Sequence, residues 1–281
     1  MSIRLRIDLS YDGSDFSGWA IQPHRRTVQG DIELALSRVF HSELQQVRTV
    51  VAGRTDAGVH ATGQVCHADL PDEAQAVLNR AGGDEHILRR LRGALGKTSP
   101  IWIQSVGRAP AGFDARFSAL SRRYEYRMAD ADSTKDPRRV DHTLWVEDLL
   151  DIGEMNTLGD TLRGVADWAS FCRARPGATT IRELQQFSWK RDADNVLVAT
   201  VIADAFCHSM VRSLVGAAVA VGRADLSVEQ IVALRDATTR TSSWKTMAAK
   251  GLTLCEVKYP PDDELFTRAE ATRSKREQPT D

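Results

Sequence analysis

The sequence predicts an α+β fold built from two similar halves, each with the element order βαββαβ. Three observations carry this prediction. Short segments alternate apolar and polar residues with period two, as strands do, and apolar residues in other segments recur with the helical period. The same order of elements then occurs a second time further along the chain.

The first half begins with a strand over residues 3–10, in which apolar residues alternate with Arg4 and Arg6. A glycine-rich turn, YDGSDFSGW, follows, and Thr27 is the expected cap of an amphipathic helix. The remaining predicted elements are strands at 47–53 and 63–70, a helix at 72–95 and a strand at 101–106.

The second half starts with a strand over 117–129 and continues with a helix over 146–162. A hairpin spans 185–206, with its turn at the sequence DADN. Helices at 208–222 and 227–236 and a strand at 251–260 complete the order.

We therefore expect two ferredoxin-like halves, 1–108 and 109–261, forming one mixed, mostly antiparallel sheet with helices on one face. The polar faces of the strands carry Arg4, Arg6, Arg123 and Arg127, so the open face is expected to form a cationic cleft. Residues 262–281 contain few apolar side chains and are expected to be disordered.

Composition indicates a globular protein, because 42% of the 281 residues are hydrophobic and the formal net charge is −1. The four cysteines, Cys66, Cys172, Cys207 and Cys255, show no paired spacing and are expected to be free thiols. No secretory segment precedes the first strand, and no run approaches the about 18 apolar residues of a membrane span. A cytoplasmic location is the expectation.

The stretch AGRTDAGVHATGQV contains the main candidate for chemistry, Asp56. Its glycine spacing is like that of a phosphate-binding loop, but Val59 and His60 stand where Lys and Ser or Thr are needed. Glycines on both sides would let a substrate approach Asp56 closely, with Arg54 and His60 flanking it. The alternative is a carboxylate that only caps a turn.

A carboxylate that stays ionised in a dry pocket needs a cationic partner. Arg212 is the candidate, because it lies on an apolar helix where an arginine without a carboxylate would be costly. Gly216, one turn further on the same stripe, would allow that helix to pack closely against a neighbour. A structural ion pair with some other acid is the alternative.

A third candidate stretch, ARFSALSRRYEYR, interleaves basic and aromatic residues. Arginines can contact a nucleic-acid backbone while a base stacks on an aromatic ring. The residues concerned are Arg116, Arg122, Arg123 and Tyr124. A strand with its aromatic side chains in the core is the alternative.

Taken together and in this order, YDGSDFSGW, TVQGDIELAL, GRTDAGVHATGQV, ARFSALSRRYEYR, ADAFCHSMVRSLVGAAVAVGR and KGLTLCEVKYP resemble the tRNA pseudouridine synthase A family, over about residues 3–260. The resemblance implies isomerisation of uridine to pseudouridine at positions 38, 39 and 40 of the tRNA anticodon stem-loop, by a homodimer without cofactor or metal. Ser209 and Ser213 stand where His and Asn are common in the family, which leaves the preferred position open.

The same resemblance assigns roles to individual residues. Asp56 is the nucleophile, and Arg54 helps to extract the target base from the helix. Tyr124 stacks on the uracil and is a candidate base for the final proton removal, and Arg212 pairs with Asp56. His60 and the arginines at 116, 122 and 123 are expected to bind the substrate.

Two other functions stay open on the residues alone. An RNA-binding module without catalysis would explain the arginines and tyrosines but not the carboxylate among glycines. A metal-dependent nuclease using Asp56 and His60 is the second, although the spacings of His60, Cys66 and His67 are not those of zinc sites. We expect no metal.

Overall fold

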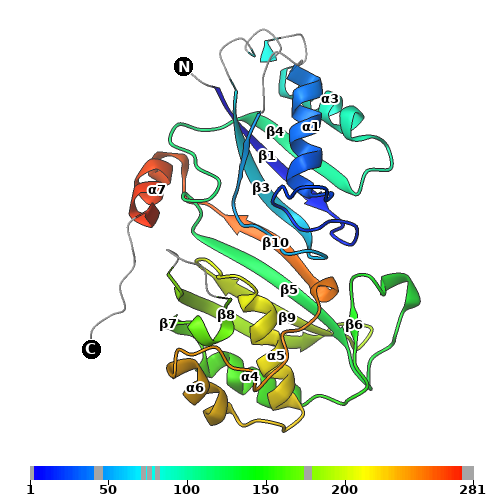
Figure 1. The fold of residues 1–281 in the computed structure, drawn as a ribbon, viewed down its shortest axis with the longest axis vertical. Coiled ribbons are helices and arrows are strands. Elements are labelled where there is room, and N and C mark those ends of the chain that lie inside the picture. Colours follow the sequence, from blue (N-terminus) through cyan, green and yellow to red (C-terminus); the bar gives the residue numbers. More distant parts are fainter. Residues whose placement is uncertain are drawn as a thin grey trace. The chain divides into compact units, whose positions relative to one another are not determined.

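The computed structural model shows two compact units, Met1–Leu120 with Leu254–Arg273, and Ser121–Thr253 (Figure 1). The residues that it describes are 3–40, 47–70, 74, 78–79, 83–173 and 179–273. The first unit is thus longer than the expected half 1–108. It also includes most of the last predicted strand, from Leu254 onward. The start of the helix expected over 72–95 lies largely outside the described residues.

The first unit is a sheet with helices packed on it. Its elements are β1 (Ile3–Tyr11), α1 (Val28–Phe40), β2 (Thr49–Val51), β3 (His60–Leu70), α3 (Gly83–Leu95), β4 (Ile101–Arg108), most of β10 (Leu252–Lys258), a short 3-10 turn (Asp262–Glu264) and α7 (Leu265–Arg273). The strand order is β4-β1-β3-β10, and β2 also pairs with β3. Helices α1 and α3 pack against each other (Figure 1).

The period-two pattern of the first strand is confirmed. Leu5, Ile7 and Leu9 on β1 are completely buried, while the residues between them are half-exposed. The predicted cap is also confirmed, because the Thr27 hydroxyl accepts a hydrogen bond of 3.2 Å from the backbone N–H of Gly30.

The second unit is a sheet of mostly antiparallel strands with three helices. Its elements are β5 (Ser121–Ala129), a 3-10 turn (Pro137–Arg139), β6 (Leu144–Trp145), α4 (Ile152–Thr161), β7 (Gly164–Asp167), a 3-10 turn (Ala169–Phe171), β8 (Ile181–Arg191), β9 (Leu197–Ala203), α5 (Met210–Gly222), α6 (Val228–Asp236) and a 3-10 turn (Ala249–Gly251). The strand order is β5-β9-β8-β7, and β6 runs parallel to β5. The mixed, mostly antiparallel character is therefore confirmed.

Two details of the second unit follow from local chemistry. Helix α4 begins at Ile152, not at 146, because the Asp151 carboxylate caps it by accepting from the N–H groups of Gly153 and Glu154 at 2.8 and 3.1 Å. The predicted hairpin between β8 and β9 is confirmed, and Asn195 in its turn has φ +59°.

The C-terminal segment corrects the prediction of a disordered tail for residues 262–273. Helix α7 buries Leu265 and Ala269, and the Leu265 carbonyl accepts a 3.0 Å hydrogen bond from the Ser118 hydroxyl. Two buried apolar residues are too few to change the composition of this segment noticeably. They nevertheless stabilise the helix once they pack against other residues of the first unit. Residues 274–281 lie outside the described part of the chain.

Among the described residues, every helix is too short or too polar to cross a lipid bilayer.

Candidate active site

Asp56 lies on the loop between β2 and β3, in the first unit. Its side chain is half-buried, and that of Arg54 is exposed. The glycine-rich turn after β1 is hydrogen-bonded to this loop. The N–H of Trp19 donates to the Thr55 carbonyl at 3.0 Å. The N–H of Gly58 donates to the Phe16 carbonyl at 3.3 Å, so backbone bonds hold the loop on both sides of the carboxylate.

Two glycines of that turn are needed for this support. A Cβ atom on Gly13 would lie only 2.1 Å from the Val59 carbonyl oxygen, and one on Gly18 would lie 2.9 Å from the Thr55 carbonyl oxygen. Gly18 also has φ +94°, which L side chains rarely adopt. The sequence showed a glycine-rich turn, but not that it carries the catalytic candidate's loop.

Side chains beneath the loop form a buried network. The Tyr11 hydroxyl lies 2.8 Å from the Thr55 hydroxyl and accepts a 3.2 Å hydrogen bond from Gln64, which also donates to the Gly53 carbonyl at 2.9 Å. Burial raises the pKa of Tyr11 to about 12, although its hydrogen bonds to Thr55 and Gln64 act in the opposite direction. Tyr11 is therefore a neutral structural group at neutral pH.

His60, the first residue of β3, is a buried part of this support. Its side chain is 3% exposed, and its Nδ1 accepts a 3.0 Å hydrogen bond from the N–H of Gly13. The Asp12 carboxylate lies 3.1 Å from the same nitrogen. This geometry favours a role in positioning the loop over the direct substrate contact expected from the sequence.

In the second unit, strand β5 separates the expected binding residues between its two faces. Tyr124 and Arg122 are buried on one face, while Arg123 is half-exposed on the other. The Tyr124 ring meets the Phe206 ring edge to face, with centroids 5.2 Å apart. Arg122 donates to the Asp204 carbonyl at 2.6 Å, which ties it into the fold.

Arg212 occupies a distinctive position on α5. The other twelve residues of this 13-residue helix are buried, whereas Arg212 is half-buried. Its Nε donates to the Met247 carbonyl at 2.6 Å. The close packing predicted from Gly216 is confirmed, because a Cβ there would lie 2.0 Å from the Lys245 carbonyl oxygen. Arg212 is thus the single charged residue of an otherwise buried helix.

The arginines expected to make the open face cationic carry acidic partners. Arg4 bonds Asp69 at 2.7 Å, and Arg6 contacts Asp8 at 2.8 Å. Arg123 contacts Glu125 at 2.6 Å, and Arg127 contacts Asp192 at 2.5 Å. These pairs neutralise the charge locally, so the four arginines do not by themselves make a cationic cleft. Two of these acids, Asp69 on β3 and Asp192 in the turn after β8, are far from their arginines in the sequence, and the other two lie two residues further along the same strand.

Arg116 lies apart from these strands, in the segment that follows β4. Its side chain is exposed, and its guanidinium lies 5.1 Å from the centre of the Phe117 ring. The exposed position is compatible with the expected contact to a nucleic-acid backbone.

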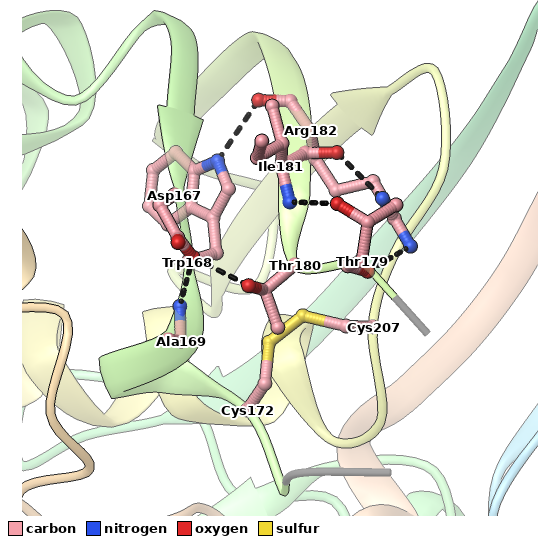
Figure 2. The surroundings of a disulfide bond; sticks show 9 residues. All are labelled: Asp167, Trp168, Ala169, Cys172, Thr179, Thr180, Ile181, Arg182 and Cys207. Atoms are coloured by element: carbon pink, nitrogen blue, oxygen red, sulfur yellow. Dashed lines mark hydrogen bonds between the residues drawn. A yellow bond between two sulfur atoms is a disulfide. The ribbon is translucent and has the colours of Figure 1, made fainter. Parts of the chain in front are cut away.

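The cysteines correct a further expectation, that all four are free. Cys172 and Cys207 form a disulfide, with Cα atoms 5.8 Å apart (Figure 2). It joins the end of the turn Ala169–Phe171 to the segment before α5. The two residues are 35 positions apart, so only the folded chain brings them together. Cys66 and Cys255 take no part in a disulfide.

Comparison with known proteins identifies the class to which this arrangement belongs. The family described as "tRNA pseudouridine synthase" matches residues 9–84 and 160–260. A protein named "tRNA pseudouridine synthase A" from Leifsonia xyli subsp. xyli is 52% identical over 97% of this chain and 97% of its own length. Proteins of the same name from Frankia casuarinae and Mycobacterium leprae are 50% and 45% identical, over 99% and 98% of this chain and 97% and 96% of their own lengths.

These matches cover the segments that hold the Asp56 loop, Arg212 and the strands around them. The chain belongs to the tRNA pseudouridine synthase family. It is an isomerase that converts uridine to pseudouridine. A solved Cbf5-Nop10-Gar1 complex aligns with 76% of this chain and 54% of its own, with a TM-score of 0.30 and 10% identity, which is too distant to support any argument.

Proposed function

We propose that this enzyme isomerises uridine at positions 38, 39 and 40 of the tRNA anticodon stem-loop, with Asp56 as the nucleophile. The observation that carries the proposal is the loop itself. A half-buried carboxylate stands on a backbone that hydrogen bonds and two close glycine contacts hold in place. Such preorganisation is what a positioned nucleophile requires.

The reaction breaks the bond between C1′ and N1, turns the detached uracil and joins C1′ to C5. The C5 hydrogen leaves as a proton and N1 takes up a proton, so the overall change is redox-neutral and needs positioning and one charged group near the sugar. Asp56 supplies that group, either by attacking C1′ or by removing the 2′ proton. Arg212 is proposed as its cationic partner, which keeps the carboxylate ionised when the pocket closes.

The target uridine must leave the base stack, which costs a few kcal/mol. Arg54, exposed on the same loop as Asp56, is proposed to help extract the base, and Tyr124 to stack on it. Arg116, Arg122 and Arg123 are proposed to bind the tRNA backbone, with Arg122 acting through the strand that it anchors. We further propose two ferredoxin-like halves, a homodimer and a cytoplasmic location.

Release of tritium from C5 of uracil tests the nucleophile, because only the isomerisation replaces that hydrogen. We expect Asp56→Asn to lower the rate by roughly 10³-fold or more. Asp15→Asn is a matched control, since Asp15 is an exposed carboxylate in the glycine-rich turn of the same unit. A comparable rate for Asp56→Asn and wild type would disprove the assignment.

The substrate position is tested with three tRNAs, each of which keeps a single uridine at 38, 39 or 40. We expect label release from each of them and none from a tRNA that has cytidine at all three positions. Sedimentation of the purified enzyme tests the proposed dimer independently.

A further inference from the structure

A small hollow opens at the N-terminal end of α5, within the second unit. Its walls come from three places: the end of the turn Ala169–Phe171, the first turn of α5 and the segment after α6. The space between its walls is about 260 Å³ with the open solvent at its mouth included, so the hollow is small and open. Besides the Trp244 indole, the polar side chains in its walls are Ser170, Arg173, Ser209, Ser213, Arg240, Thr241 and Thr246.

The charge in the hollow is entirely positive. Two of the nine residues that line it are arginines, and none is Asp or Glu. Arg173 and Arg240 are both exposed, and within the described ranges neither guanidinium has a carboxylate partner. The strand arginines differ in this respect, because each has a carboxylate partner; Arg4, for example, contacts Asp69 at 2.7 Å. Two guanidinium groups without acids attract an anion.

Ser170 supplies an independent sign of a ligand. Its residue is 3% exposed, yet its hydroxyl has no hydrogen-bond partner in the described part of the chain. Buried polar groups are nearly always hydrogen-bonded, and an exception needs an explanation. Ser170 lines the hollow, so a rotation of its buried hydroxyl toward the hollow would let a bound oxygen atom complete its hydrogen bonding.

The start of α5 adds donors and a favourable dipole. The helix begins after Ser209 without any side-chain cap, and its N-terminal end carries partial positive charge. The Ser213 hydroxyl accepts a 2.9 Å hydrogen bond from the Trp244 indole, which leaves its own hydrogen to be donated.

The walls of the hollow are tied together covalently. The disulfide between Cys172 and Cys207 joins the residue before Arg173 to the segment before α5 (Figure 2). The N–H of Arg173 also donates to the His208 carbonyl at 3.2 Å. The site is therefore largely formed before any ligand binds, which lowers the entropic cost of binding.

We propose that this hollow binds a phosphate oxyanion of the RNA backbone, through the guanidinium groups of Arg173 and Arg240 and the hydroxyls of Ser170 and Ser213. Planar guanidinium groups and hydroxyl donors match the geometry of phosphate oxygens. Arg212 follows on the same helix, so the contact would anchor the RNA beside a proposed catalytic group. The inference takes its RNA ligand from the proposed function but does not need Asp56 to be the nucleophile.

The test measures binding without turnover. A fluorescent anticodon stem-loop with cytidine at 38–40 is titrated at several salt concentrations, against wild type, Arg173→Gln, Arg240→Gln and the control Arg138→Gln. Arg138 is an exposed arginine of the same unit that already pairs with Asp136. We expect each of the first two variants to raise Kd roughly tenfold. Each should also lower the slope of log Kd against log salt by about 0.7–0.9.

Ser170→Ala gives a second readout that a merely structural role would not produce. Removing a buried hydroxyl that lacks a partner should leave the melting temperature of the free protein unchanged or raise it, while RNA binding weakens. A lower melting temperature with unchanged RNA binding would make Ser170 structural and would count against the site.

The outcomes separate the possible ligands. A wild-type salt slope in both arginine variants overturns the proposal. If inorganic phosphate binds and is lost in the variants while the RNA slope stays unchanged, the hollow takes a free oxyanion, and the RNA contact is overturned. Failure of Asp56→Asn to abolish label release would leave these binding results intact.

Discussion

The contact between Gly13 and Val59 gives the sharpest test of how the Asp56 loop is held. In Gly13→Ala the new Cβ would lie 2.1 Å from the Val59 carbonyl oxygen, and real Cβ contacts essentially never fall below 3.0 Å. The turn that carries Gly13 and the loop that carries Val59 must therefore separate by at least 3.0 − 2.1 = 0.9 Å. The Val59 N–H donates to the Asp56 carbonyl at 3.2 Å, so the displacement reaches the carboxylate.

A misplacement of about 1 Å at a catalytic group costs on the order of 10²-fold in rate. We therefore expect kcat/KM of Gly13→Ala to fall about 10²-fold, or about 2.7 kcal/mol of transition-state stabilisation. The crowding should also cost about 1–3 kcal/mol of folding stability. Initial rates of tritium release measure the first effect, and thermal melting followed by circular dichroism measures the second.

Gly93→Ala is the matched control. Gly93 lies inside α3, and a Cβ there would meet no atom within 4 Å. Alanine favours a helix more than glycine does, so this variant should be more stable by up to about 1 kcal/mol, with unchanged kcat/KM. If Gly13→Ala melts above the assay temperature and still turns over within twofold of wild type, the loop does not depend on this contact and the reasoning is wrong.

Two further predictions concern stability. Leu265→Ala should lower the free energy of unfolding by about 2–4 kcal/mol, because Leu265 is buried. Phe266→Ala, at a residue that is 62% exposed, should change it by under about 0.5 kcal/mol. Equal losses for the two variants in urea unfolding would contradict the packing of α7 against the first unit. Burial raises the pKa of Asp130, but hydrogen bonds from Arg191, Ser133 and the Leu150 N–H outweigh it and hold the pKa at about 2. The resulting stabilisation of about 2 kcal/mol is complete above about pH 4 and is lost as the pH falls to about 2. The drop in unfolding free energy between pH 5 and pH 2 should therefore be smaller by that amount in Asp130→Asn, and an equal drop would refute the assignment.

Much of the secondary structure could be read from the sequence because its causes are local. The alternation of apolar and polar residues in β1 indicates which side chains face the core. The threonine at position 27 indicates where α1 begins, because its hydroxyl can cap the helix. The hairpin after β8 needs a left-handed residue in its turn, and asparagine tolerates one. The motif GRTDAGVH likewise indicated the family without coordinates and made Asp56 the candidate nucleophile.

Only the tertiary structure decided which residues far apart in the chain contact one another. The cysteine pair spans 35 positions, and α7 is seated by contacts to Ser118 and Ala119, more than 140 positions earlier. The pairing of the strand arginines with acids, the support of the Asp56 loop by Gly13, and the unpartnered hydroxyl of Ser170 belong to the same group. Side-chain pattern fixes local conformation, whereas burial, charge pairing and close backbone contact depend on which distant segments meet when the chain folds.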